Sequence, residues 1–106
     1  MREYPFIAVY IMANQHRGTI YIGVTSDLLR RVHEHREGVY SGFTKRYALK
    51  RLVWFEQQDD MSYAIGREKT LKRYFRSWKI NLIERENPDW RDLYPDITGD
   101  PHALTH

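Results

Sequence analysis

The sequence predicts a small α/β domain in which helices flank a three-stranded, mainly antiparallel sheet. Three observations favour this fold class. Two β-rich apolar runs follow one another near the N-terminus, a third lies between helical segments, and helix-capping side chains precede those segments. The predicted order is β-β-α-β-α-α. The chain of 106 residues is long enough for one domain with a modest core and too short for two.

The first two strands are predicted to form a hairpin. Phe6 to Met12 (FIAVYIM) is a nearly unbroken apolar run, which is typical of a buried strand. Thr19 to Val24 (TIYIGV) is a second β-rich run, and the turn-forming residues Asn14 to Gly18 separate the two. If the turn closes around residues 14–17, Tyr10 faces Tyr21 directly. Their Cβ atoms would then be about 4.5–5.5 Å apart on one side of the sheet.

A helix and a third strand follow the hairpin. The helix is predicted over Leu28 to Arg36 and ends at Gly38, which can adopt the left-handed conformation of a C-terminal cap. Three consecutive side chains could cap its N-terminus: Thr25, Ser26 and Asp27. Residues 39–50 carry Gly42 and several polar residues, so we expect a loop with room for one short helical turn. Arg51 to Glu56 (RLVWFE) is the third strand.

A long helix and a C-terminal segment complete the predicted domain. The helix runs through about Trp78, and its candidate N-terminal caps are Asp59, Asp60 and Ser62. A further helix over Lys79 to Arg85 either continues it or breaks from it, and Asn87-Pro88 ends that helix. Because Gly, Pro and Asp are frequent from Pro95 onward, we expect a domain over residues 1–94 and a flexible tail over 95–106.

The composition excludes several classes of protein. The chain has no cysteine, so disulfides, thiolate zinc sites and cysteine nucleophiles are all excluded. A hydrophobic fraction of 42% and an aromatic fraction of 14% indicate a folded chain rather than a disordered one. There is no run of about 18 apolar residues and no leader-like N-terminus. We therefore expect a cytoplasmic protein with no membrane partner.

Basic residues gather in the body of the chain. The net charge is +3, yet six basic residues between Met61 and Ile80 accompany one acid, Glu68. This distribution suits a polyanion such as nucleic acid, although a solvated lysine-rich face explains the charge equally well. Four side chains are candidates for contacts to a nucleic-acid backbone: Lys45, Arg46, Lys72 and Arg73.

Two tyrosines and two helix residues are candidates for phosphate chemistry. Tyr10 and Tyr21 could together bind a phosphate oxygen or a water, although packing is the commoner role of strand tyrosines. Arg31 and His35 lie four apart on the first helix, so both project from one face. An arginine fork fits a phosphate, and a histidine beside it can transfer a proton near neutral pH. His33 points about 200° away from His35 and cannot chelate the same ion.

Glu68 is the most informative single residue. It falls on the apolar stripe of the long helix, which steps through Ala64, Leu71, Phe75, Trp78 and Leu82. A carboxylate on a core face must pair with a cation, bind a metal ion or be protonated. A salt bridge, for example to Arg31, and a metal site are equally open, because Mg²⁺ often uses only one or two protein carboxylates. The same stripe predicts that Trp78 is buried rather than a platform for base stacking.

Together these residues give the sequence a resemblance to the GIY-YIG nuclease family over residues 5–93. Tyr21-Ile22-Gly23 matches the second half of the family's name motif, and Ala8-Val9-Tyr10 keeps the tyrosine of the first half. Arg31 stands where the family has its helix arginine, and His35 matches the histidine or tyrosine that follows it. Glu68 corresponds to the family's metal-binding glutamate. The chain is most similar to the small stand-alone members.

The resemblance implies a metal-dependent endonuclease that hydrolyses phosphodiester bonds in DNA and leaves 5′-phosphate and 3′-hydroxyl ends. In this interpretation Glu68 holds one Mg²⁺ or Mn²⁺, and Arg31 grips the phosphate. Tyr21, helped by Tyr10 and His35, positions and deprotonates the attacking water. Four of these side chains, the two tyrosines, Arg31 and Glu68, are expected to meet in one pocket open to solvent. Branched or damaged DNA is a candidate substrate, and a homodimer or a partner protein could supply targeting, because so small a domain covers little DNA.

Two other functions are open at this point. One is a nucleic-acid-binding module of the same fold that cleaves weakly or not at all, whose affinity would fall steeply with salt. The other is a protein-interaction adaptor that uses the aromatic segment Trp90 to Tyr94.

Overall fold

Three antiparallel strands form the centre of the protein in the computed structural model, which describes residues 6–39 and 42–98. The sheet has the order β2-β1-β3, with β1 over Ala8–Ala13, β2 over Ile20–Thr25 and β3 over Arg51–Gln57. Every residue of the central strand β1 is buried. Its two faces are both covered, which explains why its sequence is a continuous apolar run. The predicted fold class is confirmed.

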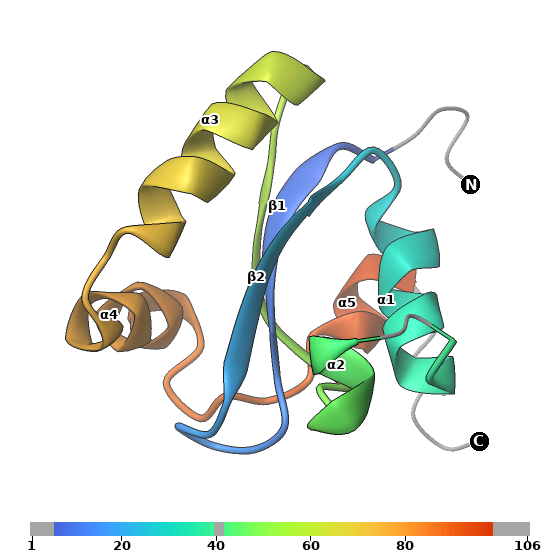
Figure 1. The fold of residues 1–106 in the computed structure, drawn as a ribbon, viewed down its shortest axis with the longest axis vertical. Coiled ribbons are helices and arrows are strands. Elements are labelled where there is room, and N and C mark those ends of the chain that lie inside the picture. Colours follow the sequence, from blue (N-terminus) through green and yellow to red (C-terminus); the bar gives the residue numbers. More distant parts are fainter. Residues whose placement is uncertain (1–5, 40–41, 99–106) are drawn as a thin grey trace.

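Helices cover both faces of this sheet (Figure 1). On one side lie α3 (Met61–Lys72) and α4 (Arg76–Glu86), and on the other lie α1 (Leu28–Glu37), α2 (Phe43–Arg46) and α5 (Tyr94–Thr98). Of the predicted caps, the Asp27 side chain accepts a hydrogen bond from the Arg30 backbone N–H and the Asp60 side chain from that of Tyr63. Gly38 ends α1 with a φ of 73°. Among the described residues, no helix has the length and apolar character needed to span a bilayer.

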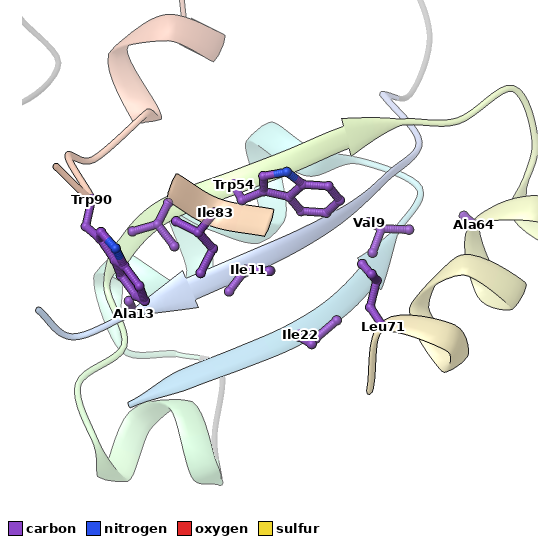
Figure 2. Packing of buried hydrophobic residues seen from close by; sticks show 10 residues of the cluster. Val9, Ile11, Ala13, Ile22, Trp54, Ala64, Leu71, Ile83 and Trp90 are labelled. Carbon is purple, nitrogen blue, oxygen red and sulfur yellow. The ribbon is translucent and has the colours of Figure 1, made fainter. Parts of the chain in front are cut away.

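Alternation along β1 divides the core into two clusters. Val9, Ile11 and Ala13 face α3 and α4, where Ile83 and Trp90 pack against them (Figure 2). The alternate residues Ala8, Tyr10 and Met12 face α1 and α5 and pack with Leu28 and Val32 among others. The side chains of β1 therefore pack against both layers of helices. The candidate tyrosines Tyr10 and Tyr21 belong to the cluster on the side of α1 and α5.

The hairpin register differs from the predicted one. Tyr10 pairs with Gly23, and Tyr21 pairs with Met12, so the pairing is shifted by two residues. The turn is centred later than expected, because the Asn14 N–H bonds to the Thr19 carbonyl and the Gly18 N–H to the Gln15 carbonyl. A shift of two keeps each side chain on its side of the sheet. Tyr10 and Tyr21 therefore still share a face, but they are diagonal neighbours.

The long helix is also shorter than predicted. It ends at Lys72, and α4 begins at Arg76 in a new direction, so the apolar stripe does not continue across the break. Phe75 and Trp78 are consequently 70% and 52% exposed, and the prediction that Trp78 is buried is wrong. Residues 95–98 form most of α5 rather than a tail, because Ile97 packs against the second cluster. The rest of the predicted tail, 99–106, lies outside the described residues.

Candidate functional site

Three aromatic rings meet on the α1 side of the sheet. Tyr10 projects from the middle of β1 and Tyr21 from the neighbouring strand β2. His35, in the last turn of α1, contacts both rings. The ring centroids are 6.2 Å apart for the two tyrosines, 5.7 Å for Tyr10 and His35, and 5.8 Å for Tyr21 and His35. The Tyr10 hydroxyl lies 3.1 Å from His35 Nε2 in a buried hydrogen bond. These three side chains are the ring cluster.

Gly23 makes room for the ring cluster. A Cβ atom at this position would lie 2.6 Å from both the Oη and the Cζ of Tyr10 and 2.8 Å from Cε2 of Tyr21. Such distances are too short for any side chain, so the phenol of Tyr10 lies directly over the bare backbone of its strand partner. In the sequence, this glycine is part of the Tyr21-Ile22-Gly23 motif. The pairing of Gly23 with Tyr10 in the hairpin explains why the motif needs a glycine, because both tyrosine rings occupy the space of a side chain.

His35 is neutral at physiological pH. Burial, together with the nearby positive charge of Arg31, lowers its pKa from the usual 6.5 to about 4, while the negative charge of Glu34 opposes this shift. A neutral imidazole can accept a hydrogen bond at one nitrogen and donate from the other. His35 can therefore accept the proton of the Tyr10 hydroxyl at Nε2 and fix the direction of that hydroxyl group.

Arg31 lies one helical turn before His35 on α1, partly exposed at the side of the ring cluster. Its Nε atom is 3.3 Å from Glu34 Oε1, and the other oxygen of Glu34 is 3.3 Å from Arg30 Nε. Two arginines thus share one carboxylate. A guanidinium at this position has the geometry to bind an anion such as a phosphate.

Glu68 lies on the opposite face of the sheet. Its side chain is only 14% exposed, and its carboxylate pairs with Lys72 at 2.8 Å, so the predicted alternative of a salt bridge is realised with this lysine rather than with Arg31. No described contact joins Glu68 to the ring cluster. The four side chains predicted to share a pocket do not all lie on one face, and Tyr10, like His35, is buried rather than open to solvent.

The edge strand β2 lies between Glu68 and the ring cluster. Around α3, Arg67 and Glu68 stand about 100° apart, on either side of the buried residues Ala64 and Leu71. Arg67 reaches Glu56 near the end of β3 with its Nε atom 2.9 Å from Oε1. Glu68 therefore lies on the other flank of α3, toward β2, because β3 and β2 are the two edges of the sheet that α3 covers (Figure 1). Tyr21 of β2 packs in the cluster on the opposite face.

The chemistry of Glu68 fits a hydrated divalent cation. Among the described residues, no three His, Cys, Asp or Glu side chains gather in a way that could hold a metal ion. A single, mostly buried carboxylate is compatible with Mg²⁺, which keeps several waters and often binds through only one or two carboxylates. The ion pair with Lys72 would have to open or shift for such a cation to bind.

The four residues predicted to contact a nucleic-acid backbone lie in two places. Lys45 and Arg46 are exposed on α2, on the same side of the sheet as the ring cluster. Lys72 and Arg73 are exposed at the C-terminal end of α3, on the other side. By contrast, Trp90 of the proposed adaptor segment is fully buried, and its Nε1 atom donates to Glu84 at 2.7 Å. This tryptophan belongs to the core and is not available to a partner.

The chain is similar to known proteins over most of its length. The model of the GIY-YIG catalytic domain matches residues 6–81, which include the ring cluster, Arg31 and Glu68. The UPF0213 protein of Haloquadratum walsbyi is 33% identical over 84 residues, covering 79% of this chain and 91% of that protein. A UPF0213 protein of Syntrophus aciditrophicus is 34% identical over 82 residues, covering 76% and 92%. One from Fusobacterium nucleatum is 29% identical over 76 residues, covering 72% and 76%. No solved structure matches the chain.

Proposed function

This chain belongs to the GIY-YIG nuclease family, and we propose that it is a metal-dependent endonuclease that hydrolyses phosphodiester bonds in DNA. The observation that carries the proposal is the ring cluster beside Arg31. Together they bring two phenols, a neutral imidazole and a guanidinium from three consecutive elements, β1, β2 and α1, to one side of the sheet. Packing alone does not require a buried hydrogen bond between a tyrosine and a histidine.

Each side chain has a distinct task in the proposed reaction. Arg31 binds the non-bridging oxygens of the scissile phosphate, because its guanidinium keeps its charge and matches the phosphate geometry. Tyr21, the more exposed of the two tyrosines, positions the attacking water and takes its proton. An isolated tyrosine has a pKa near 10, so nearby positive charge must lower it for this task. Tyr10 and His35 hold the cluster in place through their hydrogen bond.

Glu68 would hold one Mg²⁺ or Mn²⁺ on its side of β2. When bound, the ion supplies positive charge for the phosphoryl oxygens and the leaving 3′ oxygen. The DNA backbone would cross the edge of the sheet at β2, with Arg31 on one side and Glu68 on the other. Lys45, Arg46, Lys72 and Arg73 would contact neighbouring phosphates without reading sequence.

Nicking of branched, flapped and duplex DNA in the presence of Mg²⁺ tests this proposal. Arg31→Ala should lower the cleavage rate by about 10²–10³, the usual effect of losing a charge-stabilising donor. Glu68→Gln should also lower it, and added Mn²⁺ should not restore it. Arg30→Ala is the matched control, because Arg30 is the adjacent arginine, is more exposed and shares the same carboxylate.

Two outcomes would reject the proposal. Equal cleavage by the wild type, Arg31→Ala and Glu68→Gln would show that these residues do not carry the reaction. Salt-sensitive DNA binding by the wild type with no metal-dependent cleavage of any substrate would instead indicate a non-catalytic nucleic-acid-binding module of the same fold.

A further inference from the structure

A groove between α3 and α4 is not used by the proposed chemistry. Its cavity of about 320 Å³ lies at the lower end of the range for ligand pockets. Basic, aromatic and polar side chains and one leucine line it: Arg67, Tyr74, Trp78, Asn81, Leu82 and Arg85. Because Arg67 lies on the flank of α3 opposite Glu68, this groove is separate from the β2 edge.

Trp78 is held in position yet remains half exposed. Its ring makes T-shaped contacts with Tyr74, at a centroid distance of 5.5 Å, and with Phe75, at 5.4 Å. Two such contacts restrict the indole without covering it, and 52% of Trp78 is exposed. An oriented and exposed indole is suited to stacking against a flat partner, because little freedom is lost on binding.

The charge around the groove favours an anionic partner. Two of its lining side chains are basic, Arg67 and Arg85, and none is acidic. Arg67 is paired with Glu56, and Glu84, the sequence neighbour of Arg85, is paired with Arg17. Within the described part of the chain, Arg85 has no ion pair, so its charge faces the groove uncompensated. A stacking surface beside free positive charge matches a nucleobase with its phosphate.

We propose that this groove binds an unpaired nucleotide in a single-stranded segment of the DNA substrate, an inference that rests on the proposed nuclease function. Trp78 stacks on the base, the Asn81 amide hydrogen-bonds to the edge of the base, and Arg85 binds the adjoining phosphate. Stacking tolerates any base, so the groove would recognise single-strandedness rather than sequence. The preferred substrate would be DNA in which a single strand adjoins the strand to be cut.

Binding of a short single-stranded oligodeoxynucleotide in EDTA tests this proposal without cleavage. Trp78→Ala should weaken binding by roughly 5- to 150-fold, the range for losing one stacked base, and should leave blunt duplex affinity unchanged. Arg85→Gln should reduce the salt slope for the single strand by about 0.7. Tyr63→Ala is the matched control, because Tyr63 is 71% exposed on α3 and does not line the groove.

Intrinsic fluorescence gives a second readout. Of the three tryptophans, Trp54 and Trp90 are buried, so quenching by a bound oligonucleotide should come mainly from Trp78 and should disappear in Trp78→Phe. Equal single-strand affinity of Trp78→Ala and Tyr63→Ala would overturn the proposal. So would a dimer that Trp78→Ala dissociates without loss of single-strand binding, because the groove would then bind a second copy.

Failure of the groove proposal can be told apart from failure of the nuclease proposal. If Trp78→Ala binds single strands normally while Arg31→Ala still loses cleavage, only the groove proposal fails. If the wild type cleaves no DNA but Trp78→Ala loses single-strand binding, the groove proposal stands and the nuclease proposal fails.

Discussion

At the scale of single residues, the two tyrosines of the ring cluster depend on Gly23 and His35 for their positions. Gly23 provides the space in which the phenol of Tyr10 lies, and His35 provides the hydrogen bond that orients it. The pKa of His35, lowered to about 4, keeps the imidazole neutral at pH 7. His35 therefore stabilises the site as a hydrogen-bonding group and does not add positive charge near the phosphate.

The lowered pKa of His35 predicts a pH dependence of stability. Between pH 6.5 and about 4, the unfolded chain protonates this histidine while the folded chain does not. The free energy of unfolding should therefore be highest above pH 6.5 and should fall as the pH drops toward 4, by roughly 2–4 kcal/mol. Urea titrations across this range measure it.

His33 supplies the control for this prediction. His35→Gln should remove the histidine contribution to the pH dependence, while His33→Gln, at an exposed position of the same helix, should leave it intact. If wild type and His35→Gln lose stability in parallel between pH 6.5 and 4, His35 does not have the lowered pKa.

At the scale of the elements, the β1–β2 loop is fixed to α4 by a set of polar contacts. Arg17 binds both oxygens of Glu84, at 2.7 and 2.8 Å, and Glu84 also accepts from Trp90. Arg76 donates to the carbonyls of Arg17 and Gly18, both at 2.7 Å. These contacts hold Arg17 at a φ of 52°, in the left-handed region. They link the hairpin turn, on which the register of the tyrosines depends, to a helix on the other face.

Glu84→Gln should loosen this loop. The hydrogen bonds from Arg17 and Trp90 lower the pKa of Glu84 to about 2, so the carboxylate is charged and the contacts persist at any pH well above that value. With a neutral amide, the amide protons of Asn14 and Gly18 should exchange faster, while those of β3 stay protected. Hydrogen exchange followed by NMR measures this.

Glu86→Gln is the control, because Glu86 lies near the end of the same helix and forms no ion pair with a described residue. Equal exchange rates at Asn14 and Gly18 in the wild type and Glu84→Gln would show that the turn holds its conformation without the helix.

At the scale of the whole molecule, the C-terminal part of the chain completes both core clusters. The family match ends at residue 81, yet Ile83 and Trp90 are fully buried in the first cluster, and Leu93, Tyr94 and Ile97 pack on the second. The Asp92 side chain accepts hydrogen bonds from the backbone N–H groups of Leu52 and Tyr94 and binds Arg36 on α1. Residues 82–98 therefore join the two layers of helices.

A chain that ends after Asn81 should not fold cooperatively. The loss of Ile83 and Trp90 alone removes two large side chains from the core, and such a loss typically costs 2–5 kcal/mol per residue, which is comparable to the whole stability of a small domain. Near-UV circular dichroism and thermal unfolding measure the result. A chain that ends at Thr98 is the control, because it keeps all the described contacts. A cooperative transition in the shorter chain close to that of the control would contradict this prediction.

The sequence by itself determined the elements whose pattern is local. The apolar run of β1 and the C-terminal cap Gly38 depend on neighbouring residues, so both were predictable. The N-terminal caps were predicted to within three candidates each, of which Asp27 and Asp60 are the ones used. The placement of Arg31 and His35 on one face of α1 follows from helical spacing in the same way. The family resemblance, which depends on the order and spacing of a few residues, was confirmed for the same reason.

Only the tertiary structure decided which residues meet. Shifting the hairpin by two residues leaves the pattern of faces unchanged, so the sequence could not distinguish Tyr10 opposite Gly23 from Tyr10 opposite Tyr21. The break after Lys72 exposed Trp78, because a helical stripe predicts burial only while the helix stays straight. Glu68 was placed across β2 from the ring cluster by the packing of α3 on the sheet, which depends on contacts between distant segments and not on local pattern.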